Sequence, residues 1–190
     1  SGIYKLTSNG EDIVIGTAAD WATNTEESIK VAEEISKKDP HYSIHLGDTY
    51  YVGEPDEIAA NFLPEENSNW HRGSKGSFAV LGNHEMYARG IAFFRDLLPN
   101  MGLRNSTGKF EGQKAGYFCL ENEHWRILGL DTGYHSVGKL PILEMIPKIG
   151  PNCHFYQSLM DWLSKTVKLS DPADKRGIVI LTHHQPITAF

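Results

Sequence analysis

Short apolar runs that end in polar side chains constrain this chain more than any other feature. There are four of them, at 13–15, 42–46, 78–81 and 178–181. They lead respectively into Asp20, Gly47-Asp48, Gly82-Asn83-His84-Glu85 and Thr182-His183-His184. Continuous apolar runs of this kind are typical of buried strands in α/β sheets, whose ligands bind where the strands end. We therefore expect an α/β fold that gathers these polar side chains at one sheet edge.

Residues 11–51 form a convincing β-α-β unit. A strand at 13–17 precedes a helix at 25–38, and a second strand follows at 42–46. Thr25 is a suitable N-cap and Pro40 prevents the helix from continuing. Because such crossovers are right-handed, the two strands lie side by side, which brings Asp20 and Asp48 to the same edge.

The rest of the chain supplies the other elements of a single domain. Its pattern predicts helices at 54–62, 90–98 and 155–168, strands at 77–81, 117–120, 125–130 and 178–181, and loops at 64–76 and 105–116. The strands at 117–120 and 125–130 form a hairpin around 121–124. Residues 137–153, rich in proline and glycine, are expected to run over the rim of the site.

Composition narrows the function classes. A length of 190 residues suits one domain, and 40% hydrophobic with 22% charged residues is ordinary for a globular protein. A net charge of −6 with no Lys/Arg run argues against a nucleic-acid-binding patch. No segment is apolar enough to span a membrane, and no signal-peptide pattern opens the chain. These two observations favour a soluble cytoplasmic protein but leave the compartment open. The oligomeric state also stays open.

The two cysteines, Cys119 and Cys153, are expected to be free, buried thiols, since two are too few for a disulfide framework. Among the histidines, His45 alternates into its strand and is expected to be a packed core residue. His135 follows Asp131-Thr132-Gly133 and is a weaker candidate for the pocket.

The donor set indicates a metal centre. Asp, Asn, His and Tyr suit hard or borderline cations such as Fe, Mn, Zn or Mg, and the absence of cysteine disfavours a structural zinc site. Two metals about 3.5–4 Å apart need a shared ligand, for which Asp48 is the natural bridge. Such a pair activates water and clamps a phosphoryl oxygen, so phosphate-ester hydrolysis is the reaction that this set most directly serves.

With these motifs the chain resembles the calcineurin-like metallophosphoesterases, a family with a layered β-sheet sandwich flanked by helices. The family pattern is D-x-H or D-x-G, G-D-x-x-[YD], G-N-H-[DE], a lone His and G-H-x-H. The chain has Asp20-Trp21-Ala22, Gly47-Asp48-Thr49-Tyr50-Tyr51, Gly82-Asn83-His84-Glu85 and Thr182-His183-His184. Ala22 replaces the metal-binding His, and the purple acid phosphatase branch, which has Gly there, uses the Tyr that matches Tyr51.

The resemblance implies a role for each matching residue. Asp20 and Tyr51 would bind a first metal, expected to be iron, and Asp48 would bridge both. Asn83 and His183 would bind the second metal, which is Fe, Mn or Zn, and His183 is preferred to His184 because it follows the strand directly. His84 would contact a small phosphate ester as general acid.

One departure leaves a second interpretation open. The final G-H-x-H does not occur before Phe190, so we expect residues 1–190 to be a single domain that lacks its C-terminal strands. The leading hypothesis is a binuclear metallophosphoesterase. The alternative is a catalytically silent module that keeps the fold for protein contacts. A protein phosphatase is not expected, since Gly47 onward departs from that branch's motif.

Overall fold

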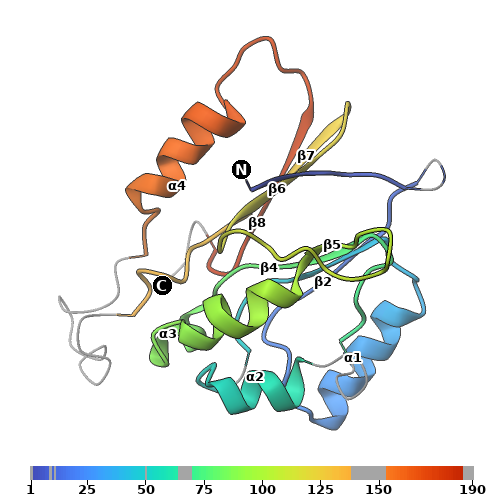
Figure 1. Ribbon diagram of the computed structural model, residues 1–190. Helices are drawn as coiled ribbons and strands as arrows, with labels where there is room; N and C mark the ends of the chain where they lie inside the picture. Colours follow the sequence, from blue (N-terminus) through green and yellow to red (C-terminus); the bar gives the residue numbers. More distant parts are fainter. Residues whose placement is uncertain are drawn as a thin grey trace.

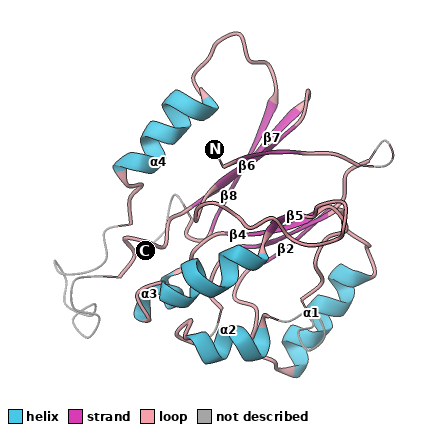
Figure 2. Cartoon of the chain, viewed as in Figure 1, coloured by secondary structure: helices cyan, strands magenta, loops and turns pink. Residues whose placement is uncertain are grey.

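Two β-sheets lie face to face in the computed structural model and helices cover both outer faces (Figures 1 and 2). The structure describes residues 2–8, 10, 12–49, 51–63, 70–137 and 153–185. This layered α/β arrangement confirms the expected fold class. The expected rim excursion falls almost entirely on 138–152, outside the described residues.

The first sheet carries most of the motifs. Its strand order is β2-β3-β4-β5, and the strands are β2 (Ile15–Ala18), β3 (Tyr42–His45), β4 (Gly76–Ala79) and β5 (Gly102–Leu103). The first three strands are parallel, and only β5 runs antiparallel to its neighbour. The predicted adjacency of the first two strands is therefore confirmed, and the loops after β2, β3 and β4 emerge at one edge.

The second sheet supplies one more motif. Its order is β1-β6-β7-β8, with β1 (Ile3–Lys5), β6 (Phe118–Glu121), β7 (Trp125–Leu130) and β8 (Gly177–Thr182). Strands β6 and β7 form the predicted antiparallel hairpin, while β8 lies parallel to β7. The segment after β8 thereby reaches the end of the sandwich where the loops of the first sheet emerge, as the contact of His183 with Leu46 shows.

Helices pack on the outside of each sheet. The first sheet is covered by α1 (Glu26–Ser36), α2 (Pro55–Asn61), α3 (Asn83–Tyr87) and the turns η1 (Phe93–Leu97) and η2 (Leu98–Asn100). The second is covered by α4 (Gln157–Asp161) and its π-helical continuation η4 (Trp162–Val167). Helix α1 begins as predicted, because the Thr25 side chain caps it by accepting from the Ser28 N–H.

Three buried clusters hold these layers together. The middle one, with the fully buried Phe78 and Phe118, joins the two sheets. The others lie between the first sheet and its helices, around Phe62, and between the second sheet and α4, around Trp162. Each such side chain contributes about 1.5–3 kcal/mol by leaving water, so the sandwich is a firm support for its edge loops. No helix in the described part of the chain is long and apolar enough to cross a membrane.

One local expectation was wrong. Cys153 is exposed rather than buried, although both cysteines are free as expected and Cys119 is buried. The sequence pattern assigns no secondary structure to the Gly82-Asn83-His84-Glu85 stretch. It begins the short helix α3, because the Glu85 side chain accepts from the Gly82 N–H at the helix start.

Candidate metal centre

The loops after β3 and β4 approach each other unusually closely. A Cβ on Gly82 would lie 2.1 Å from Asp48 Oδ1, and one on Gly47 would lie 2.6 Å from the Gly82 nitrogen. Gly47 also has a φ of +98°, which favours glycine. Both glycines of the G-D and G-N-H motifs are thus required by the close approach that places Asp48 beside α3.

Backbone conformation marks the acidic residues of the site. Asp20 and Asp48 both have positive φ, 56° and 62°, in the left-handed region that non-glycine residues rarely adopt. Such conformations cost on the order of 1–3 kcal/mol and cluster at functional sites. The Asp20 N–H donates to the Gly47 carbonyl at 2.9 Å, which ties the first two loops together.

Asp48, Asn83 and His183 converge on one point from three different loops. His183 Nε2 lies 3.3 Å from Asp48 Oδ2 and 3.2 Å from Asn83 Oδ1. His183 Nδ1 lies 2.9 Å from the Leu46 carbonyl, which can only accept, so this nitrogen carries a proton. In the neutral imidazole, Nε2 then carries a lone pair instead of a proton, and it faces two oxygen acceptors. Such a cluster needs a proton or a cation between its atoms.

The electrostatics of the site agree with that geometry. Burial raises the pKa of Asp48, but hydrogen bonds with His183 and the His84 N–H outweigh it and hold this pKa below its usual range. Burial lowers the pKa of His183, but the hydrogen bond and charge of Asp48 outweigh it and raise this pKa above its ordinary value. Both shifts favour the carboxylate form of Asp48 and the imidazolium form of His183. A metal would replace that proton, since only the neutral imidazole can bind one.

His84 lies on the more open side of Asp48. Its backbone N–H donates to Asp48 Oδ1 at 2.9 Å, and its Nε2 lies 3.7 Å from Asp48 Oδ2. Its Nδ1 is hydrogen-bonded to the Tyr51 carbonyl, which orients the ring. With the side chain 26% exposed, Nε2 is accessible to a ligand next to the converging donors.

The other two candidate ligands are less enclosed. Asp20 is exposed, and Tyr51 is 64% exposed. The main chain of Tyr51 is fixed, because its N–H donates to Glu57 Oε1 at 2.8 Å and its carbonyl holds His84. Among the residues that the structure describes, no three His, Cys, Asp or Glu side chains are placed to hold a metal by themselves. The tight convergence consists of one carboxylate, one imidazole and one amide.

Glu85 is a positioning residue that the sequence did not reveal as such. Its side chain is fully buried and accepts hydrogen bonds from the backbone N–H groups of Asp48 at 3.1 Å, Gly82 at 2.8 Å and Thr49. Burial raises its pKa, an effect that these donors oppose. The motif's acidic fourth position was the available signal, but its function depends on donors 36 and 37 residues earlier in the chain.

His45 is a buried core histidine, as predicted, and it also joins two loops of the site. Its Nε2 donates to the Trp21 carbonyl at 3.1 Å, and its Nδ1 accepts from the Gly47 N–H at 3.2 Å. Burial lowers its pKa to about 4, so the ring is neutral at physiological pH. A neutral ring is what the donor and acceptor pattern requires.

The loop after β7 forms the opposite wall. Asp131 is buried and accepts from the N–H groups of Gly133 and Tyr134, both at 3.0 Å. A Cβ on Gly133 would lie 2.4 Å from the Gly82 carbonyl, so this loop packs directly on the start of α3. Thr132 Oγ1 binds the main chain and Nδ1 of His184 at 3.1 and 3.0 Å. His184 is thereby turned towards Thr132, whereas His183 faces Asp48.

Comparison with known families shows which family the chain belongs to. The family model for calcineurin-like phosphoesterases matches residues 13–189, which include all of the candidate residues. The chain therefore belongs to the calcineurin-like phosphoesterase family. Membership indicates a metal-dependent phosphoester hydrolase, although the family also includes inactive members. A comparison with curated proteins found no significant match.

Proposed function

We propose that this protein hydrolyses small phosphate esters with a pair of metal ions held at the edge of the sandwich. The observation that carries the proposal is the convergence of two oxygen atoms on His183 Nε2, which lies 3.3 Å from Asp48 Oδ2 and 3.2 Å from Asn83 Oδ1. Carboxylate, imidazole and amide oxygen are a donor set that divalent and trivalent cations accept readily.

The candidate ligands would divide between two ions. Asp48 would be shared by both, Asn83 and His183 would hold one of them, and Asp20 and Tyr51 would hold the other. Iron is proposed for the side with Tyr51, and Fe, Mn or Zn for the side with His183. When bound, such a pair supplies Lewis acidity, which activates a water near neutral pH and neutralises charge on the phosphoryl oxygens.

The remaining residues orient the metal ligands and supply a proton to the leaving group. The Tyr51 carbonyl accepts the Nδ1 proton of His84, so the ring can donate a second proton, from Nε2 to the leaving-group oxygen, only as the imidazolium. The Leu46 carbonyl fixes the His183 tautomer, as hydrogen-bond partners of metal-binding histidines commonly do. Glu85 keeps the Asp48 loop and α3 in register.

The direct test is hydrolysis of 4-nitrophenyl phosphate and bis(4-nitrophenyl) phosphate by protein supplied with Fe, Mn or Zn. Activity should require metal, and His84→Ala should lower turnover by about 10²–10⁴-fold while metal content stays constant. His124→Ala is the matched control, because His124 is an exposed histidine on the β6–β7 turn. Loss of metal in His84→Ala would refute its role. Absence of both metal and activity in the unmodified protein would favour the silent module.

The purple acid phosphatase branch is a finer proposal that depends on Tyr51. A phenolate is a hard anionic donor that favours Fe(III), and coordination lowers the phenol pKa far below its free value of about 10. Iron-loaded protein should then be coloured by a phenolate-to-iron charge-transfer band. Tyr51→Phe should bleach that band, whereas Tyr87→Phe, at a neighbouring tyrosine on α3, should keep it. A colourless iron-loaded protein would remove Tyr51 from the site.

A further inference from the structure

A hollow of about 520 Å³ lies directly beside the candidate metal centre. It is bounded by the ends of β7 and β8 and by the segment that leads into α4. The residues that shape it include Leu130, Thr132, Cys153, Phe155, Ile180 and His184. Its volume falls within the range of about 300–1,000 Å³ that is typical of small-molecule sites.

Two consecutive histidines separate the hollow from the metal centre. His183 faces Asp48, and His184 lines the hollow, with the two rings 4.7 Å apart and nearly perpendicular. His184 is fixed on both sides, since Thr132 Oγ1 holds its ring and Thr182 Oγ1 donates to its carbonyl at 2.9 Å. A group bound in the hollow would therefore lie in a defined position relative to a phosphate at the metals.

The chemistry of the walls selects the kind of group. No Lys, Arg, Asp or Glu occurs among the described residues that line the hollow. Phe155, Leu130 and Ile180 give it apolar walls, and Ile180 is 58% exposed. His154 and His184 line it as well, so no permanently charged side chain among its described lining residues balances a phosphate, whereas its apolar walls can bury an uncharged ring.

We propose that this hollow binds the organic group of the phosphate ester, which makes esters of aryl and other bulky apolar alcohols the preferred substrates. The proposal rests on the proposed phosphoester hydrolysis at Asp48 and His183. It adds that the wall residues Phe155 and Ile180 determine which substrate binds. These two residues are distinct from the candidate metal ligands Asp48 and His183. Sugar and glycerol phosphates, whose hydroxyl groups would lose hydrogen bonds there, are disfavoured.

Two isoleucines of β8 allow a matched kinetic test. Ile180 lines the hollow, whereas Ile178, two residues earlier on the same strand and 48% exposed, does not. Ile180→Trp should fill the hollow and raise KM for 1-naphthyl phosphate by about tenfold, with little effect on methyl phosphate. Ile178→Trp should leave both substrates unchanged. Equal KM values for 1-naphthyl phosphate in the two variants would overturn the proposal.

Cys153 provides a readout that does not depend on catalysis. It is an exposed thiol on the wall of the hollow, while Cys119 is buried and its pKa is raised to about 12, mainly by burial. A maleimide should thus label Cys153 selectively. The non-hydrolysable (1-naphthylmethyl)phosphonate at ten times its Kd should slow labelling by about tenfold, because only unoccupied protein reacts. Methylphosphonate should not slow it.

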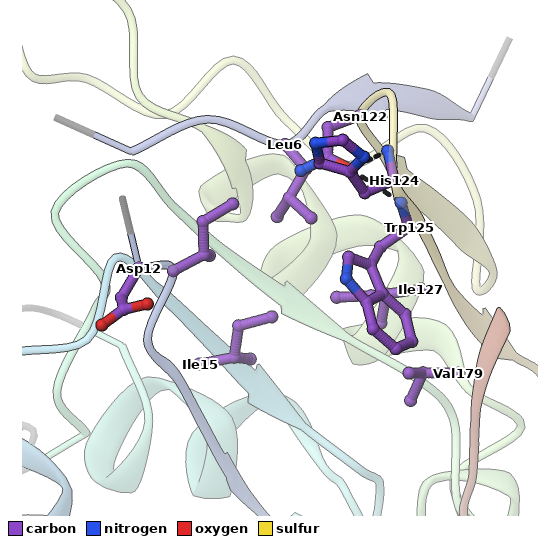
Figure 3. Close-up of a pocket in the computed structure, with 9 residues that line it drawn as sticks. Leu6, Asp12, Ile15, Asn122, His124, Trp125, Ile127 and Val179 are labelled. Carbon is purple, nitrogen blue, oxygen red and sulfur yellow. Dashed lines mark hydrogen bonds between the residues drawn. The ribbon is translucent and has the colours of Figure 1, made fainter. Parts of the chain in front are cut away.

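A second apolar hollow serves as the control for misplaced binding. It has a volume of about 380 Å³ and lies at the opposite end of the sandwich, with Trp125, Ile15 and Ile127 among its walls (Figure 3). If Trp125→Ala abolishes binding of the naphthyl phosphonate and Cys153 stays unprotected, the ring binds there and the proposal is wrong. Protection of Cys153 without hydrolysis of any ester would uphold the hollow and refute the proposed function instead.

Discussion

Gly82→Ala tests whether the site depends on the close approach of the Asp48 loop to α3. The φ of Gly82 is −99°, which any residue can adopt, so the substitution introduces no backbone strain of its own. Its new Cβ would lie 2.1 Å from Asp48 Oδ1, which is 1.3 Å short of the 3.4 Å at which ordinary contact begins. The same Cβ would lie 2.6 Å from the Asp48 nitrogen, so the Asp48 backbone and carboxylate must both move, the carboxylate by about 1 Å, which disturbs its hydrogen bond from the His84 N–H.

The two expected effects differ in size. Overpacking of this kind costs about 1–3 kcal/mol, which for a domain of this length lowers Tm by about 2–12 °C. A misplacement of about 1 Å at a reacting site can cost about 10²-fold in rate. Thermal unfolding measures the first effect, and metal-supplemented hydrolysis of 4-nitrophenyl phosphate measures the second. Gly10→Ala is the control, since no atom lies within 4 Å of its new Cβ. A Gly82→Ala variant as active and as stable as Gly10→Ala would refute the reasoning.

Three further substitutions probe the supports of the site. Glu85→Gln should cost about 1–3 kcal/mol of stability and weaken metal binding by about 10–100-fold. The Glu85 carboxylate now accepts hydrogen bonds from three backbone N–H groups, and an amide would turn its own N–H towards some of them. Calorimetry with Mn²⁺ measures the loss of metal binding. Burial raises the pKa of Asp131 from 3.8 to about 6, so the folded protein binds this proton more tightly than the unfolded chain, and stability falls as pH rises from about 4 to 6. Asp131→Asn should remove that fall, worth up to about 3 kcal/mol, in urea unfolding at pH 4 and pH 7, and an unchanged pH dependence would contradict a buried Asp131 acid. Ala22 is fully buried and has a φ of 97°, a strained conformation for a non-glycine residue. The Ala22→Gly variant should therefore be about 1–3 kcal/mol more stable than Ala32→Gly, which changes a buried alanine in helix α1. Equal free energies of unfolding for the two variants would show that no strain resides at Ala22.

The features predicted correctly from sequence depend on local patterns. Tyr42–His45 was recognisable because an apolar run alone indicates a buried strand, and Thr25 because a cap acts within its own helix. The family motifs added the candidate site residues, and the structure shows a steric reason for the glycines at positions 47 and 82.

Features that the sequence left open or did not reveal depend on partners far away in the chain. Whether His183 or His184 faces Asp48 is decided by a hydrogen bond to Leu46, 137 residues earlier, and by Thr132 on the neighbouring loop. Glu85 was seen as part of a motif, but not as the acceptor for the Asp48 loop. The exposure of Cys153 could not be derived from residue type, which on average favours burial.

Metal content of the Asp48 and Asp20 variants tests the central claim most directly. The unmodified protein, Asp48→Asn, Asp20→Asn and the exposed control Asp12→Asn would be incubated with Fe and Mn, freed of unbound ions and measured by elemental analysis. Because Asp48 is proposed to bridge both ions, Asp48→Asn should lose both, Asp20→Asn should lose at most one, and Asp12→Asn should match the unmodified protein. Equal metal content in Asp48→Asn and the unmodified protein would contradict a metal centre built on Asp48.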